Sequence, residues 1–158
     1  MPDVTTGVFP VHKNVFKIDT SGRSGTAALA TIADLTTFKL SVEGKNEEWY
    51  PLDQEGWARH ANTGKKLAIS FTGKRRYGDA GNDYIASMLM KTGKDCESAF
   101  EWVLPNGAKL AGNCIINLTS PAGGDSTAID NLEFELLVDG KPTFTAAQII
   151  QNTRRKVK

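Results

Sequence analysis

The sequence predicts a mainly β protein: an antiparallel β-sandwich or half-barrel with one flanking α-helix, a long inter-strand loop and N- and C-terminal arms. Three observations predict this fold. Several segments alternate apolar and polar residues with the period of two that a half-buried strand shows. One long segment changes to a helical period instead. Turn-forming Gly, Pro and Asn residues separate the strands in hairpin order.

The composition bounds the answer further. Of 158 residues, 40% are hydrophobic and 23% are charged, which suits one domain with a real core. The formal net charge of +1 gives no case for binding nucleic acid or a membrane. The first residues lack the pattern of a signal peptide, so we expect a protein made and kept in a cytoplasm. Cys96 and Cys114 are then predicted to be free thiols, with Cys114 facing inward from a strand.

We interpret the whole chain, 1–158, as a single domain. An N-terminal arm takes residues 1–35, a core takes residues 36–142 with a helix near 79–92, and a C-terminal arm takes residues 143–158. A strand candidate and a flexible break lie within the N-terminal arm. They are Val15, Phe16 and Ile18, followed by 20–25.

The first clear strand of the core carries Phe38, Leu40 and Val42, which alternate with polar residues. Residues 44–46 indicate a turn. Residues 51–65 lack clean periodicity, so we expect a long loop there, and loops of this length are usually functional or disordered.

Residues 66–72 alternate again and predict another strand. The helical period follows, with Asp79 as the N-cap and Gly93 as the C-terminal stop. Tyr84 and Ile85 lie on the apolar face of this helix.

A hairpin with its turn at 105–109 comes next, and a Gly- and Ser-rich loop at 120–127 follows it. The last clear strand, 132–138, alternates apolar and polar residues and ends at 139–142. A short helix is expected at 146–152, before a basic tail.

Candidates for catalysis are few. A nucleophile–base pair of Cys96 or Cys114 with His60 stays open, although no local signature supports it. Neither His12 nor His60 stands beside a second metal-ligand type at a metal-binding spacing. We therefore predict no enzyme activity, no cofactor and no metal site.

Three further motifs each have a functional and a structural interpretation. Residues 78–82 could form a phosphate loop, but they lack the P-loop and dinucleotide spacings and fit a capped turn. The basic run 74–76 could contact phosphate or form a solvated strand end. Glu133 and Glu135 could be a paired acid and base, but neighbours along one strand more often form an exposed face.

Eight short segments carry a resemblance to a known family. They are EWYPLD (48–53), GW (56–57), KLAISFTGKR (66–75), YGDAGNDY (77–84), FEW (100–102), GGDS (123–126), LEF (132–134) and DGKPT (139–143). In their order and spacing they resemble the major tail tube proteins of long-tailed bacteriophages, especially the siphophage type. These proteins are related to the tube proteins of contractile tails and of type VI secretion.

The resemblance implies a structural subunit. Family members are β-sandwich proteins with one flanking helix; they form hexameric rings that stack into a tube, and a long loop and terminal arms bridge the subunits. The implied partners are other copies of the chain, the tape-measure protein, the tail terminator and the distal tail or baseplate proteins, with DNA passing transiently and no membrane involved. The implied location is the virion tail, with the host cytoplasm during assembly. A siphophage tail, a contractile tail, a prophage remnant and a tail-like bacteriocin all stay open.

The lumen of such a tube should not bind phosphate, because basic contacts would hold the passing genome. A strand face without Lys or Arg is therefore predicted to line it, the alternative being that its glutamates face the tube exterior. The predicted lumen-facing residues are Asn113, Asn117, Asn131, Glu133 and Glu135.

Contacts between subunits or rings are predicted at Trp49, Tyr50, Leu52 and Trp57, because aromatic residues tend to dominate interface energetics. Trp49 and Tyr50 could instead belong to the subunit's own core. The alternative function is a β-sandwich binding module that recognises a carbohydrate or protein through Trp49, Tyr50 and Trp57.

Overall fold

The computed structural model describes residues 6–147. Its elements, in chain order, are η1 (Val11–Lys13), β1 (Val15–Asp19), β2 (Leu29–Thr31), β3 (Leu35–Trp49), η2 (Leu52–Gln54), β4 (Arg59–Lys74), α1 (Ala80–Ala86), η3 (Ser87–Met90), η4 (Gly93–Cys96), β5 (Glu97–Val103), β6 (Lys109–Ser120) and β7 (Asn131–Thr145).

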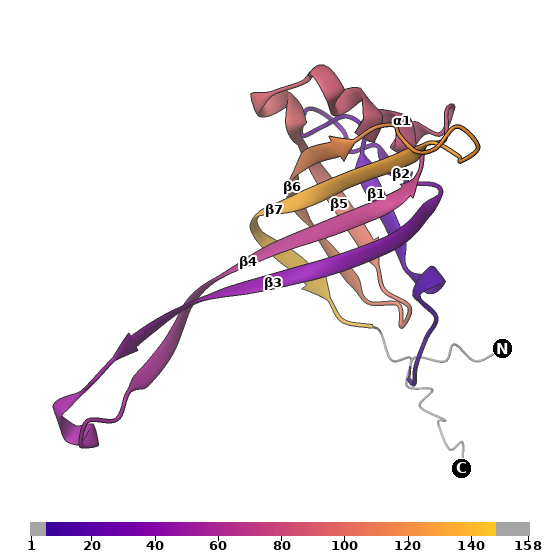
Figure 1. Cartoon of the computed structure of the whole chain (residues 1–158). Helices are drawn as coiled ribbons and strands as arrows, with labels where there is room; N and C mark the ends of the chain where they lie inside the picture. The colour runs from indigo at the N-terminus through magenta and orange to yellow at the C-terminus, as the bar shows by residue number, and fades with distance from the viewer. Residues whose placement is uncertain (1–5, 148–158) are drawn as a thin grey trace, which may run out of the picture.

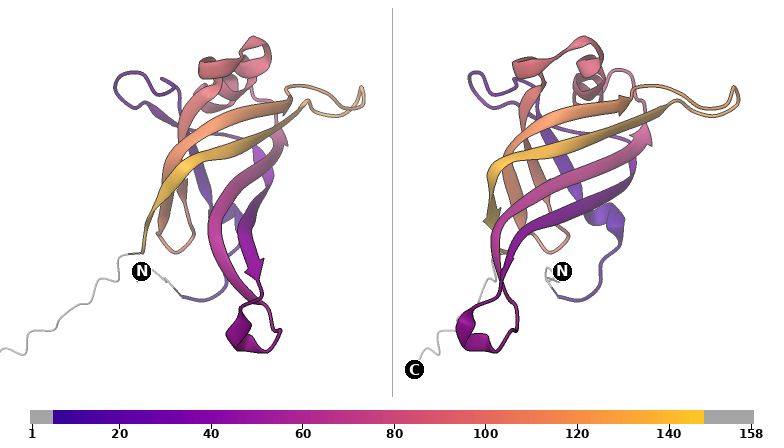
Figure 2. Two further views of the ribbon diagram at one scale, coloured as in Figure 1. Left: turned by 90° about the vertical axis from the view of Figure 1, so that its left-hand side faces the viewer. Right: turned by 60° about the vertical axis from the view of Figure 1, so that its left-hand side comes forward.

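The strands form one antiparallel sheet in the order β2-β1-β5-β6-β7-β4-β3. The sheet curls into a half-barrel, as Figures 1 and 2 show. α1, η3 and η4, here called the helical cap (residues 80–96), cover one end of it. The predicted mainly β fold with a flanking helix is confirmed.

Aromatic side chains close the half-barrel from inside. The ring centroid of Phe16 on β1 lies 4.7 Å from that of Phe38 on β3 and 4.7 Å from that of Phe71 on β4. The Phe16 ring also stacks on the Trp102 ring of β5, with 5.4 Å between their centroids. Because β1 and β3 are not neighbours in the sheet, side-chain packing holds them together where hydrogen bonds do not. The remaining large buried apolar side chains are Ile18, Ile32, Ile69, Ile85, Met88, Phe100, Leu110, Ile116, Leu132, Phe134 and Leu136.

The first turn of α1 is fixed by its cap and by a close backbone approach. The carboxylate of Asp79 accepts hydrogen bonds from the backbone N–H of Asn82 at 3.0 Å and of Ala33 at 3.2 Å, so the predicted N-cap is confirmed. At Gly81 a Cβ atom would lie 2.6 Å from the carbonyl oxygen of Thr31. Only glycine lets the helix approach the end of β2 this closely.

Asn82 is fully buried and joins three segments. Its Oδ1 accepts hydrogen bonds from the backbone N–H of Arg76 at 3.1 Å and from the Arg75 guanidinium at 2.8 Å. Its Nδ2 donates to the carbonyl oxygens of Lys74 at 2.9 Å and of Ala33 at 3.3 Å. The helical cap is thereby attached to the end of β4 and to the turn between β2 and β3.

The sheet begins earlier and ends later than the sequence predicted. Residues assigned to the N-terminal arm form β1, as the strand candidate there suggested, and β1 lies between β2 and β5 with Phe16 and Ile18 buried. At the other end β7 continues to Thr145, beyond the predicted stop at 139–142. Most of the helix expected at 146–152, and all of the tail that follows it, lie outside the described residues.

Two expectations for the middle of the chain are wrong. The turn expected at 44–46 is absent, because β3 runs through it with a register shift between Lys45 and Asn46. The long loop expected at 51–65 is a loop only in part, because β4 begins at Arg59. No helix among residues 6–147 is long and apolar enough to cross a bilayer.

Replacing Asn82 with Ala is expected to lower the free energy of unfolding by about 2–4 kcal/mol, because buried partners on β4 and the β2–β3 turn lose their hydrogen bonds. Chemical denaturation of the monomer measures this. Asn117→Ala, on an exposed position of β6, is the matched control and should change stability by less than about 0.5 kcal/mol. Equal effects of the two substitutions would contradict the structural role of Asn82.

Candidate functional site

The distal parts of β3 and β4 form a hairpin arm, residues 44–65, that projects away from the half-barrel (Figure 1). β4 pairs with β7 only from Ala68 onward, so before that residue its one neighbour among the strands is β3. The cross-strand pairs continue outward to Trp49 opposite Arg59. The result is a two-stranded ribbon with no face against the core.

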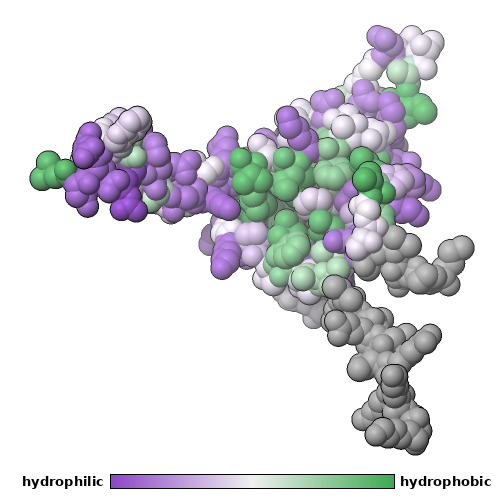
Figure 3. Space-filling model, turned by 90° about the horizontal axis from the view of Figure 1, so that it is seen from below, coloured by the Kyte–Doolittle hydropathy of each residue, from purple (hydrophilic) through white to green (hydrophobic). Residues whose placement is uncertain are grey.

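Polar contacts across the ribbon support its hydrogen-bond ladder. The amide of Asn62 donates to the side-chain oxygen of Asn46 at 2.8 Å, and the Thr63 hydroxyl donates to the carbonyl of Lys45 at 3.2 Å. Seen from below, hydrophilic side chains cover the arm, with hydrophobic ones at its far end (Figure 3). Isolated two-stranded hairpins are marginally stable in water, so the arm depends on the sheet to which it is attached.

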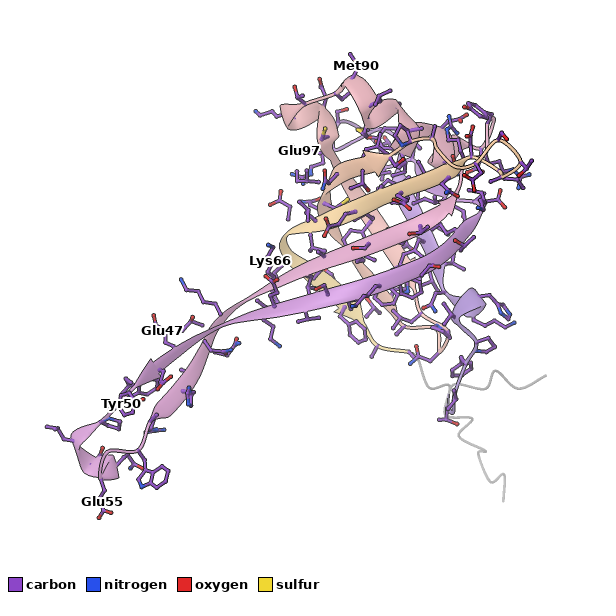
Figure 4. The ribbon with its side chains drawn as sticks, in the orientation of Figure 1. Glu47, Tyr50, Glu55, Lys66, Met90 and Glu97 are labelled. Carbon is purple, nitrogen blue, oxygen red and sulfur yellow. The ribbon has the colours of Figure 1, made fainter. Side chains whose placement is uncertain are left out.

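The tip of the arm carries the four predicted contact residues, and all four are exposed. Leu52 and Trp57 show 104% and 76% of their reference area to solvent, and Trp49 and Tyr50 show 42% and 66%. The alternative that Trp49 and Tyr50 belong to the subunit's core is therefore wrong. Figure 4 shows Tyr50 and Glu55 beside the chain reversal at the end of the arm.

Local contacts at the tip shape it without covering it. The guanidinium of Arg59 lies 5.9 Å from the Trp49 ring centroid. The Tyr50 hydroxyl donates a hydrogen bond to Glu48 at 2.5 Å, which raises the pKa of the phenol. Both contacts lie along the ribbon, so the apolar faces of Leu52 and Trp57 stay available.

The outward surface of β3, β4, β7 and β6 is a second candidate, here called the exposed sheet face. Glu135 lies between Ser70 on β4 and Asn117 on β6, and Glu133 lies between Thr72 and Ser120. Asn113 lies farther along β6 opposite Asp139, and Asn131 lies at the start of β7 opposite Lys74. The predicted polar patch is thus brought together on one face by strand pairing.

Lysines share this face, although the sequence predicts that the strand carrying Lys66 and leading to Lys74 has that end away from the lumen-lining strands. Lys39 on β3 pairs with Ser70 on β4, and Ser70 pairs in turn with Glu135 on β7. Lys66 lies opposite Glu43, with 3.8 Å between the ammonium nitrogen and the carboxylate oxygen. A shallow groove of about 260 Å³ runs over this part of the face. Its lining residues are Lys39, Ser41, Glu43, Lys66, Ala68, Ser70, Glu135 and Leu137. The face is therefore of mixed charge toward the arm and acidic or neutral around Glu133, Glu135 and Asn117. At the other end, the Lys74 ammonium donates to Asn131 at 2.8 Å.

A polar hollow of about 480 Å³ lies between residues 20–24 and the helical cap. Arg23 lines this hollow and holds residues 20–24 in place, although the sequence predicted a flexible break there. The guanidinium donates to the carbonyl oxygens of Ser98 at 3.2 Å and Cys114 at 3.1 Å, and it pairs with Asp139 at 2.8 Å. The segment is therefore anchored on β5, β6 and β7, through long-range bonds that no local pattern indicated.

The basic run 74–76 is built into the fold. Arg75 has a side chain only 10% exposed, 2.7 Å from the Asp83 carboxylate, and its guanidinium lies 4.2 Å from the Tyr77 ring centroid. Arg75 lowers the pKa of Asp83 mainly by this hydrogen bond. Arg75 is thus a structural residue of the α1 junction, and the interpretation of a solvated strand end is wrong for it.

The structure separates the residues of the proposed nucleophile–base pair. Cys114 is buried in the core on β6, as its inward position predicted, while His60 lies on the hairpin arm opposite Glu48. Burial raises the pKa of the Cys114 thiol to about 12. Cys96 is a second free thiol, and its Sγ donates to the carbonyl of Lys91. Among residues 6–147 there is no group of three His, Cys, Asp or Glu side chains that could hold a metal ion.

Thiol labelling at pH 8 should therefore modify Cys96 and spare Cys114. The thiolate is the reacting form, and a pKa of about 12 keeps Cys114 protonated well above neutral pH. A chromogenic disulfide reagent should report about one thiol per native chain, none after Cys96→Ser, and two when the wild type is unfolded. Rapid labelling of two thiols in the native protein would contradict this assignment.

Comparisons with known proteins bear on the fold. Searches with family models and against curated proteins give no match to this chain. Among solved structures, the chain is similar to one from the tail of an empty gene transfer agent particle with C6 symmetry, at 21% identity and a TM-score of 0.70, covering 88% of this chain and 100% of that one. A chain from the virion of a native gene transfer agent gives 18% identity and a TM-score of 0.67 with the same coverage. A chain from the sheath–tube complex of an extracellular contractile injection system, PVC, in its extended state gives 11% identity and a TM-score of 0.53, covering 88% and 92%.

Proposed function

We propose that this chain is the structural subunit of a tail tube. The observation that carries the proposal is the fold, which matches the whole length of a chain from a gene transfer agent tail. The hairpin arm supports it, because exposed aromatic side chains at the end of a projecting ribbon have no function in the subunit's own core. The proposal places the protein in the tail of a virion or of a related particle.

In the proposed assembly, six copies form a ring and rings stack into a hollow tube. Trp49, Tyr50, Leu52 and Trp57 contact adjacent subunits or rings. The tube surrounds a tape-measure protein and later conducts DNA, and its ends meet a terminator and a distal tail or baseplate protein. Subunits are made in the host cytoplasm and assemble there.

The exposed sheet face is proposed to line the lumen. On β7 and β6 it presents Glu133, Glu135, Asn113 and Asn117, which give phosphate no cation to bind. Asn131, at the edge of this patch, accepts a hydrogen bond from the Lys74 ammonium at 2.8 Å, so one cation lies at that edge. Lys39 and Lys66 lie toward the arm, with Glu43 and Glu135 lining the same groove. This arrangement lets an anionic polymer slide, because nearby carboxylates reduce the attraction that the lysines exert on it.

Self-assembly tests the proposed function. The variant Trp57→Ala tests whether the Trp57 side chain contacts an adjacent subunit or ring. The purified chain should form rings or tubes at high concentration, visible by negative-stain electron microscopy. Trp57→Ala should raise the polymerisation concentration about 10-fold or more, since loss of an interfacial aromatic anchor costs about 2 kcal/mol. Its monomer should unfold like the wild type, because this side chain is exposed.

Trp57→Phe is the matched control and should retain most of the polymerisation, because it keeps an aromatic ring. Normal polymerisation of Trp57→Ala would show that Trp57 is not a contact between subunits or rings. A wild-type chain that stays monomeric at every concentration and is absent from purified particles would refute the tube itself.

The lumen assignment is tested by charge reversal. Neither Glu133 nor Glu135 forms an ion pair within residues 6–147, so the double variant Glu133→Lys, Glu135→Lys should fold and form tails. DNA release from particles carrying it should slow, because each ring would add cations that hold phosphate. Fluorescence of released DNA measures the rate.

The control makes the same charge change off the sheet face, with Asp125→Lys and Asp130→Lys in the exposed loop between β6 and β7. It should release DNA at the wild-type rate. A map of the tube that puts both glutamates on the outer wall would rule the lumen assignment out.

A further inference from the structure

We propose that the tip of the hairpin arm docks on the helical cap of a second copy of this chain. This inference rests on the proposed function and names the two surfaces that meet when subunits add along the tube. It joins residues 47–58 of one copy to residues 89–94 and the adjoining hollow of the next.

The two surfaces lie at opposite ends of the subunit. In Figure 4, Tyr50 and Glu55 lie at the far end of the arm and Met90 at the outer end of the helical cap. The views of Figure 2 show the same opposition. A contact between two different surfaces is heterologous, so each docked copy still presents a free tip and a free cap. Such a contact propagates in one direction, as stacking requires.

The tip combines negative charge with exposed apolar area. Residues 47–58 contain four acidic side chains and no Lys or Arg, and Arg59, the next residue, lies 5.9 Å from the Trp49 ring centroid. Asp53 and Glu55 are exposed and form no ion pair within the described part of the chain. Leu52 and Trp57 are the most exposed apolar residues of the arm.

The cap offers the complementary chemistry. Leu89 and Met90 are 63% and 88% exposed at the end of η3. Lys91 and Lys94 follow directly, and within residues 6–147 neither is paired with a carboxylate. Both lysines line the 480 Å³ hollow, which is open to a side chain from outside.

The acids beside these lysines do not cancel them. Glu97 is 3.5 Å from Arg23, but the same guanidinium lies closer to Asp139, at 2.8 Å, so Arg23 offsets only part of the charge of these two carboxylates. The lining of the hollow holds three cations, Arg23, Lys91 and Lys94, and two carboxylates, Asp95 and Glu97. An acidic, apolar tip therefore meets a basic, apolar acceptor, and complementary charge of this kind selects partner and orientation.

Another hollow fits the tip less well. The groove of about 300 Å³ between η1, β1 and β3 has apolar walls, but its lining includes Asp34 and no Lys or Arg. A carboxylate of the tip buried in this groove would lose its hydration without gaining an ion pair, which is energetically unfavourable. The distal strand segment of the arm places the tip roughly 20 Å farther from the half-barrel, at about 3.3 Å per residue.

Charge reversal with rescue tests the pairing in the full-length chain. The tip reversal is Asp53→Lys with Glu55→Lys, and the cap reversal is Lys91→Glu with Lys94→Glu. Each alone should raise the polymerisation concentration about tenfold or more, because like charges then oppose each other. The four changes combined should return it to within about threefold of the wild type. Sedimentation measures this concentration, and denaturation checks that each monomer folds.

The control combines the tip reversal with Lys13→Glu and Lys141→Glu, two exposed lysines outside the cap. It should not restore polymerisation, and restoration there would assign the effect to net charge and overturn the inference. If the tip reversal fails to fold, Asp53→Asn with Glu55→Gln replaces it and should give a smaller loss of the same kind.

A cap reversal that polymerises normally would show that the tip binds elsewhere. That result, or a failure of the combined variant to recover while wild type forms tubes, would overturn only this inference. A wild-type chain that never forms tubes would instead refute the proposed function.

Discussion

The packing of Phe16 against Phe38 is the interaction on which the rest of the fold depends. The first and last parts of the sheet are five strands apart, and nothing in the ladder draws them together. The aromatic contacts of Phe16 with Phe38, Phe71 and Trp102 provide that closure, together with the short link of residues 32–34 between the edge strands β2 and β3. Because side-chain packing closes the half-barrel and backbone hydrogen bonds do not, β3 remains an edge strand. Over its 15 residues, the backbone N–H and C=O groups on its outer edge can still pair with another strand.

The arm follows from unequal strand lengths around that closed core. β3 and β4 extend past Ala68, the last residue of β4 that pairs with β7, so within residues 6–147 no third strand covers a face of the ribbon. A ribbon in this position can be polar along its length, as Asn46 and Asn62 are, and still hold its shape. Apolar side chains at its tip gain nothing from the subunit. Their stabilisation comes only when another surface removes them from water.

Sequence reasoning succeeded for most segments that have one buried face, although the helix predicted near 79–92 ends as an α-helix at Ala86 and Val42 is exposed. The alternation at Phe38 and Leu40, the inward Cys114 and the cap at Asp79 all express local rules, and the structure confirms each. It failed at 59–65, because a strand exposed on both faces has no hydrophobic period to detect. Arg23 and Asn82 were missed because their partners lie far apart in sequence or on backbone atoms, which a residue pattern does not encode. The pairing of Asn117 with Glu135 could be predicted, because β6 and β7 are consecutive strands of a hairpin. Lys39 lies on the same face only because β4 pairs with β7, and these two strands are not consecutive in the sequence.

Weak individual contacts are an advantage for a subunit of this kind. A tip of a dozen residues covers much less than the 1,200 Å² or so that a stable pair of free proteins needs, so two isolated copies have little affinity. In the proposed ring, six tips are held together and face six acceptors at once, and each contact after the first is effectively intramolecular. The same surface that leaves free subunits dissociated therefore binds a completed ring firmly. Below the concentration at which the chain polymerises by itself, growth is then limited to ends where a ring already exists.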